Sequence, residues 1–91
     1  MYAVVARVSI DPSRGDEAVE ILNQAVVPMS KAAPGFASGV WVRGLDGTTG
    51  CSIELFDTEE NARTFAEAAV VPPGAPVTID SVEIMEVTAT A

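Results

Sequence analysis

Glu54 is the residue of this chain whose type and position best suit a catalytic base. It shares a face of an expected strand with Ser52 and Phe56, and that strand is otherwise largely apolar. If this face points inward, desolvation would raise the pKa of the Glu54 carboxyl and make it a general base in a chain without histidine. The competing interpretations are a buried ion pair with Arg7 or Arg43, and simple exposure near a sheet edge.

Arg7 is the second candidate for a catalytic role, because it stands alone in an apolar strand. Its guanidinium could bind an anionic or enolate oxygen. The alternative is a structural arginine that pairs with a carboxylate such as Glu54 or Glu83.

Trp41 is the only tryptophan, and it lies in mid-strand on the same side as Arg43. Its indole could stack on a flat aromatic ligand, and we predict a ligand-binding set of Trp41, Phe56 and Phe65. The competing role is packing in the core or at a dimer interface, because burying an indole contributes on the order of a few kcal/mol.

The composition removes several other kinds of chemistry. Without histidine, the chain lacks the usual proton shuttle at neutral pH and the commonest transition-metal ligand. Nothing nearby in the sequence would activate Cys51, which we interpret as a small apolar core residue. Asp80, Glu83 and Glu86 do not have the spacing of a calcium loop. We therefore expect no metal and no cofactor.

The charge balance restricts the partners and the compartment. Five basic and 13 acidic residues give a net charge of −8, which would repel nucleic acid and anionic membrane surfaces. No apolar run could span a bilayer, and the first residues do not resemble a signal peptide. A single cysteine cannot form an internal disulfide, in agreement with a reducing compartment. We expect a cytoplasmic protein.

The predicted elements are organised around a β-hairpin at residues 36–57, in which Asp46-Gly47 suits the tight turn. Residues 2–10 are rich in β-branched side chains that alternate between two faces, and we expect them to form the first strand. In the first strand of the hairpin, one expected face carries Phe36, Val40 and Val42, and the other carries Trp41 and Arg43. In the second strand, one expected face carries Cys51, Ile53 and Leu55, and the other carries Ser52, Glu54 and Phe56. The first strand places Val4, Ala6, Val8 and Ile10 opposite Ala3, Val5, Arg7 and Ser9.

Two helices are expected between the strands. Ser13 should cap the first helix, and Pro28 should kink or break it because proline lacks the backbone N–H. The second helix should begin at Asp57 or Thr58 and end at Val71 before two prolines. The apolar stripe of the first helix, which should pack on the sheet, is Ala18, Ile21, Leu22, Ala25, Met29 and Ala32.

Residues 77–88 are predicted to form the last strand. One face of this strand should carry Ile79, Met85 and Val87, and the other face Val82 and Ile84. At about 3.3 Å per residue such a strand is near 40 Å long, about twice the typical length, so part of it should reach beyond its own sheet.

The element order β-α-β-β-α-β predicts one α+β domain over residues 1–91, with a ferredoxin-like four-stranded antiparallel sheet. Both helices then cover the same face. The other face still carries large apolar groups, and a second copy of the chain is the simplest cover for it. We therefore predict a homodimer.

The chain resembles the dimeric α/β-barrel superfamily, and within it the antibiotic biosynthesis monooxygenase-like proteins. The resemblance lies in Ala33-Pro34-Gly35-Phe36, in the hairpin, and in the run from Glu54 to Phe65. It implies a homodimer whose two sheets close into a barrel. Some members oxidise polycyclic aromatic substrates without metal or flavin, and others degrade haem.

The residues that haem-degrading relatives use are missing. Their Asn, Trp and His positions fall near Ala6, on Phe56, and around Phe65 or Ala66. The resemblance therefore argues against haem oxygenation. Our leading hypothesis is a cofactor-independent monooxygenase that binds a small apolar or aromatic molecule and uses Glu54 as base, and the alternative is a non-catalytic ligand-binding or structural dimer.

Overall fold

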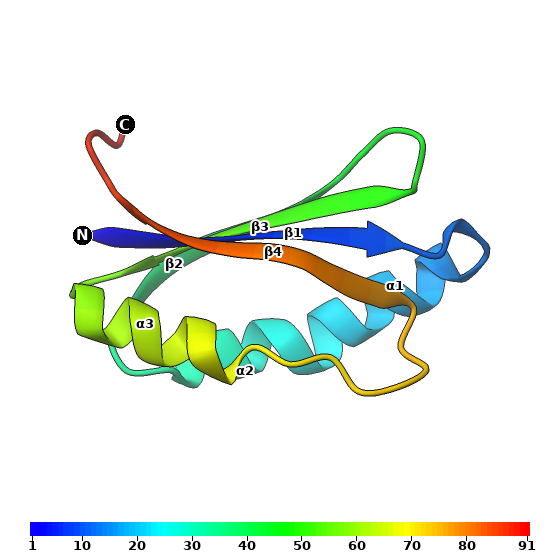
Figure 1. Cartoon of the computed structure of the whole chain (residues 1–91), viewed down its shortest axis with the longest axis horizontal. Helices are drawn as coiled ribbons and strands as arrows, with labels where there is room; N and C mark the ends of the chain where they lie inside the picture. The colour runs from blue at the N-terminus through cyan, green and yellow to red at the C-terminus, as the bar shows by residue number, and fades with distance from the viewer.

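The computed structural model describes residues 1–91 as a four-stranded antiparallel sheet with helices on one face (Figure 1). The strand order is β2-β3-β1-β4, so β2 and β4 form the edges. The predicted α+β ferredoxin-like fold is confirmed. The elements are β1 (Tyr2–Ile10), α1 (Gly15–Ile21), α2 (Val27–Ala32), β2 (Phe36–Arg43), β3 (Thr49–Phe56), α3 (Glu59–Ala68) and β4 (Val77–Glu86), with a 3-10 turn at Pro12–Arg14 and a π-helical turn at Leu22–Val26.

The core lies between β1, β3 and α3. Val4, Phe56 and Ala62 are its most enclosed apolar residues. The predicted alternation of β1 is confirmed, because Val4 faces the helices and the side chains of Ala3 and Val5 point to the other face of the sheet. Both of these residues are buried, but by strand neighbours rather than by helices.

The β2–β3 hairpin forms at the predicted turn, where Gly47 has a φ of 78° and Asp46 Oδ1 accepts a hydrogen bond from Thr48 N at 2.9 Å. The predicted face of Phe36 was wrong. A β-bulge between Phe36 and Ser38 adds one residue to β2, so Phe36 packs into the core while Val40 faces away from the helices.

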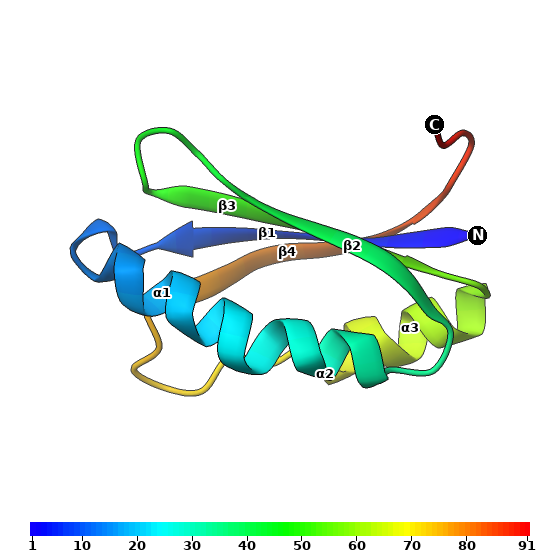
Figure 2. The ribbon, with the colours of Figure 1, turned by 180° about the vertical axis from the view of Figure 1, so that it is seen from behind.

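The first helix runs on through Pro28 without a break (Figure 2). Instead of a kink, the helix widens into a π turn directly before α2, which begins with Val27 and Pro28. The predicted cap was wrong, because α1 begins after Arg14 without a side-chain cap. Asp11 instead caps the 3-10 turn that precedes α1, and its carboxylate accepts a hydrogen bond from Ser13 N at 3.0 Å.

The π turn also corrects the predicted stripe of the first helix. A π turn holds one residue more than an α turn, so every position after it moves round the helix by one residue. Met29 was expected to face the sheet but is 56% exposed, whereas Ser30 is 0% exposed. Ile21 also lies outward. The inward residues of this segment are Ala18, Leu22, Val26, Val27 and Ser30.

Thr58 begins α3 as predicted, and its hydroxyl accepts a hydrogen bond from Asn61 N at 3.1 Å. Ala62, Phe65 and Ala66 then pack against the core as expected. The helix ends at Ala68, earlier than the predicted end at Val71.

The last strand is shorter than predicted and does not leave its sheet. It ends at Glu86, and it pairs with β1 from Val77 opposite Ile10 to Glu86 opposite Tyr2. Asp80 is an extra residue at a bulge, which places Ile79 on the same face as Val82 and Ile84 and corrects their predicted separation. Residues 87–91 then turn toward the helix-free side (Figures 1 and 2).

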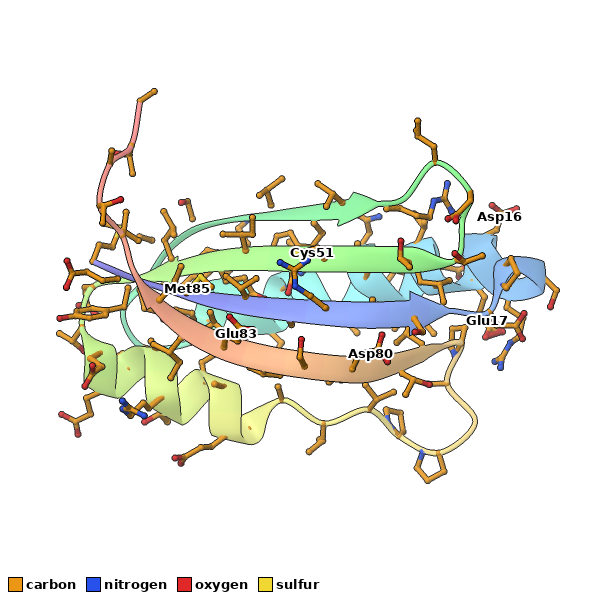
Figure 3. The ribbon with its side chains drawn as sticks, turned by 45° about the horizontal axis from the view of Figure 1, so that its top comes forward. Asp16, Glu17, Cys51, Asp80, Glu83 and Met85 are labelled. Atoms are coloured by element: carbon orange, nitrogen blue, oxygen red, sulfur yellow. The ribbon has the colours of Figure 1, made fainter.

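The helix-free face of the sheet is largely apolar. Figure 3 looks onto it with the helices behind, and shows Cys51 on β3 and Asp80, Glu83 and Met85 on β4. The large exposed apolar residues of this face are Val40, Val42, Ile53 and Met85. No helix of the chain has the length and apolar character needed to cross a membrane.

Candidate functional site

Glu54 lies on β3 with its side chain in the layer between sheet and helices, and it is 4% exposed. The molecule has two ion pairs, Arg14–Glu17 and Arg63–Glu59, and both are on the surface. Glu54 therefore has no cationic partner. Its Oε2 atom is enclosed and makes no hydrogen bond.

The surroundings of Glu54 favour its neutral form. Burial raises the pKa of the Glu54 carboxyl above its ordinary value of 4.5, and the nearby hydroxyls of Ser30 and Ser52 offset part of that rise. Such a group can accept a proton near neutral pH more readily than a solvated glutamate can.

Ser30 approaches the Glu54 carboxyl from the helical layer. It is fully buried on α2, and its Oγ atom has no hydrogen-bond partner of good geometry. The hydroxyl is nevertheless close enough to Glu54 to lower the pKa of that carboxyl. The sequence did not reveal Ser30, because its inward position depends on the π turn. Pro28 inside a helical pattern was the one available signal of an irregular turn.

Trp41 lies on the helix face of the neighbouring edge strand, near Glu54. Gly39 pairs with Glu54, and Trp41 pairs with Ser52. A Cβ atom at Gly39 would lie 2.9 Å from Trp41 Cη2 and 3.4 Å from Glu54 Cγ, so the indole and the Glu54 side chain both lie over the glycine. The indole is half-buried at this edge of the sheet.

Arg7 does not join this group. It pairs with Cys51 and Ser81 on the helix-free face, whereas Glu54 is on the helix face. The sheet separates the two predicted catalytic residues. Arg7 makes no ion pair within the chain and is exposed.

Phe56 and Phe65, the other two predicted ligand-binding residues, belong to an aromatic cluster with Phe36. The ring centroids of Phe36 and Phe56 are 5.9 Å apart in an edge-to-face arrangement, and those of Phe56 and Phe65 are 4.9 Å apart. Phe56 has no exposed surface. In this structure it packs the core, and Phe65 is half-buried beside it.

Two surface grooves lie away from Glu54. One, of about 400 Å³, is lined by Arg63, Ala66, Glu67, Val82 and Ile84, between α3 and the edge strand β4. The other, of about 490 Å³, is formed by residues between Ala69 and Ile79. Neither groove reaches Glu54 or Trp41.

The chain offers no cluster of three or more Cys, Asp or Glu side chains that could hold a metal ion. Cys51 is a free, partly buried cysteine on the helix-free face, paired across the strands with Arg7 and Val42. The candidate site is therefore Glu54 and Ser30 with Trp41 at their edge.

Comparisons with known proteins bear on the family and on the fold. The family model described as antibiotic biosynthesis monooxygenase matches residues 1–70. The crystal structure of a monooxygenase from the gene ActVA-Orf6 of Streptomyces coelicolor, in complex with the ligand nanaomycin D, is similar with a TM-score of 0.66 and 18% identity. The match covers 99% of this chain and 89% of that one. No curated protein matches the chain.

Proposed function

The chain belongs to the antibiotic biosynthesis monooxygenase family, and from this premise we propose that it oxidises a small, flat aromatic molecule with molecular oxygen, without metal or flavin. The site is the layer between sheet and helices at Glu54, with Trp41 beside the ligand. The observation that carries the proposal is a buried carboxylate without a counter-ion next to an indole. Buried, perturbed carboxyl groups of this kind are typical of catalytic bases.

The proposed reaction needs one proton acceptor and oxygen. Glu54 takes a proton from the acidic C–H of an anthrone-type substrate, or from an O–H group of a quinol-type substrate. For an anthrone, the resulting carbanion gives its electrons to oxygen and forms a carbon–oxygen bond. Loss of water from the hydroperoxide then leaves a carbonyl, so that a CH₂ group and O₂ become C=O and H₂O. Exclusion of solvent by Trp41 would protect the anion.

Arg7 has a different place in the proposal. Because it points from the helix-free face, it cannot reach an enolate oxygen beside Glu54 in the same chain. A role for Arg7 in catalysis would require substrate on that other face.

The proposal includes a homodimer formed through the helix-free face, giving a dimeric α/β barrel. Val40 is 50% exposed and Ile53 is 39% exposed on this face, and both lie among other apolar side chains. An apolar sheet face of this kind is typical of a surface that is covered in the assembled protein. A cytoplasmic location is also part of the proposal, and rests on the single cysteine and the absence of a disulfide.

Air oxidation of an anthrone or quinol by the purified protein tests the activity. The wild-type chain should accelerate conversion to the quinone, and Glu54→Gln should lose that acceleration by about a hundredfold or more, the typical contribution of a general base. Glu20→Gln, a change on the exposed side of α1, is the matched control. Equal rates for the wild-type protein and Glu54→Gln would remove Glu54 from the mechanism.

A non-catalytic ligand-binding or structural dimer is the second candidate. The observation in its favour is that Glu54 and Ser30 are enclosed and that both grooves lie elsewhere. Binding of an aromatic ligand at Trp41 without any turnover under air would favour ligand binding. Absence of both binding and turnover would favour the structural role.

A further inference from the structure

We infer that Ser30 and Glu54 together form a binding site for one hydroxyl group of an aromatic ligand, a phenol or an enol, whose ring lies against Trp41. The inference rests on the proposed function for its location between sheet and helices. It adds a second binding residue, Ser30, and it names the group of the ligand that Ser30 would bind, one hydroxyl.

The first argument is the pair of buried polar atoms without partners. Ser30 Oγ and Glu54 Oε2 are both enclosed, and neither makes a hydrogen bond of good geometry, although the Ser30 hydroxyl lies near the Glu54 carboxyl. Leaving such groups unpaired costs free energy, so native structures seldom keep them without a reason. A ligand that pairs both atoms at once would recover this free energy on binding.

The chemistry of the two atoms selects a hydroxyl. A hydroxyl can accept a hydrogen bond from Ser30 and donate one to the Glu54 carboxylate. If Glu54 is neutral, the same hydroxyl can accept from the carboxyl and donate to Ser30. The nitrogen of an aromatic amine donates hydrogen bonds but accepts them poorly, because its lone pair is delocalised into the ring, so an aromatic amine fits this pair less well.

The second argument is the π turn that places Ser30. Without the extra residue at Leu22–Val26, the predicted stripe would turn Met29 toward the sheet. The helix thus departs from regular geometry directly before the one serine that it buries. Single π turns within α-helices are frequently found at functional sites, where they reorient a side chain.

The third argument is the shape of the space beside the pair. Gly39 has no side chain, and the Trp41 indole and the Glu54 side chain both lie over it. An indole that swings away from Gly39 would leave a flat-walled slot whose inner end is Glu54 and whose wall is the ring itself. Planar aromatic molecules suit such a slot because they stack on indole.

Three probes and one resonance test the site. Trp41 is the only tryptophan and gives a single indole N–H signal in a ¹H–¹⁵N spectrum. Titration with naphthalene, 2-naphthol and 2-naphthylamine, followed at this signal, gives the affinity for the bare ring, the hydroxyl and the amine. Wild-type protein should bind 2-naphthol at least tenfold more tightly than naphthalene and more tightly than 2-naphthylamine.

Two variants then test whether Ser30 and Glu54 cause the preference for 2-naphthol over naphthalene. Ser30→Ala and Glu54→Gln should each reduce the naphthol-to-naphthalene affinity ratio by about tenfold and leave naphthalene binding unchanged. Ser13→Ala, an exposed serine near the start of the first helix, should keep the wild-type ratio. Because the ratio is taken within each variant, a general loss of folding would not imitate the effect.

Three results would overturn the inference: an unchanged ratio in Ser30→Ala, tighter binding of the amine than of the naphthol, or no binding of 2-naphthol by the wild-type protein. Its fate is separable from that of the proposed activity. Hydroxyl-selective binding without oxidation would leave the site standing and remove the monooxygenase. Unchanged oxidation of an anthrone by Ser30→Ala, together with an unchanged affinity ratio, would leave the monooxygenase standing and remove the hydroxyl-binding site.

Discussion

Ser30 comes from the helical layer and Glu54 from the sheet, and the two side chains lie near each other between the layers. Each is enclosed and has an oxygen that makes no hydrogen bond of good geometry. One is brought there by a π turn and the other by strand alternation. Trp41 closes the edge of the same group across Gly39. The site is therefore small and polar, and it is surrounded by apolar packing.

Glu54→Gln is expected to raise the free energy of unfolding at pH 7 by on the order of 1 kcal/mol, because the variant no longer buries an ionisable carboxyl. In the wild-type protein the pKa of Glu54 is raised on folding, from an ordinary value of 4.5. Between that value and the folded pKa, the folded state binds more protons than the unfolded chain. Stability should therefore fall as pH rises through this window.

Urea unfolding from pH 4 to pH 8 measures this effect. At the acid end, below the ordinary pKa, Glu54 is protonated in both states and the stability associated with it is fully present. Glu54→Gln should flatten the decline toward neutral pH, and Glu20→Gln should retain it. The same pH slope in Glu54→Gln and in the wild-type protein would contradict the assignment of the slope to Glu54.

Ile53→Asp should disrupt the proposed dimer, because it places an unpaired charge in the middle of the helix-free face. The dissociation constant should rise by at least about a hundredfold, which corresponds to about 3 kcal/mol. Light scattering after size-exclusion chromatography gives the mass. Val19→Asp on α1 is the matched control, since Val19 is 41% exposed. A monomeric wild-type chain at micromolar concentration would refute the dimer itself.

Gly39→Ala should displace the Trp41 indole, because the new methyl carbon would lie only 2.9 Å from Trp41 Cη2. As the indole moves toward water, its fluorescence emission should shift to longer wavelength. Ser38→Ala is the control on the same strand, since Ser38 points to the opposite face. An unchanged spectrum for Gly39→Ala would show that the ring does not lie over the glycine.

Thr58→Ala should destabilise the chain by about 1 kcal/mol, because the Thr58 hydroxyl caps α3 by accepting from Asn61 N. Thr64→Ala is a matched control within the same helix. The Thr64 hydroxyl donates to the Glu60 carbonyl at 3.0 Å, and alanine has the higher helix propensity, so little stability should be lost there. Thermal unfolding compares the two variants, and equal losses would argue against the cap.

The sequence by itself determined the kind and order of the elements. Alternation of period 2 at Tyr2–Ile10 and in the hairpin, and helical spacing in α3, arise from local backbone geometry and can be read from side-chain type alone. The surplus of apolar residues on two sheet faces, with helices for only one, is also a property of the sequence pattern.

The tertiary structure decided which way individual side chains point, because three single extra residues interrupt those periods. The π turn at Leu22–Val26 moves Met29 out and Ser30 in, the bulge after Phe36 turns that ring into the core, and the bulge at Asp80 reverses the face of Ile79. A one-residue insertion leaves composition and spacing nearly unchanged but turns the following side chains to another face.

The tertiary structure also decided that Glu54 and Arg7 lie on opposite faces of the sheet. Each lay in a strand whose alternation was read correctly, yet only the pairing of Arg7 with Cys51 showed that the two residues lie on opposite faces. Register between strands far apart in sequence depends on long-range packing, which local periodicity does not contain.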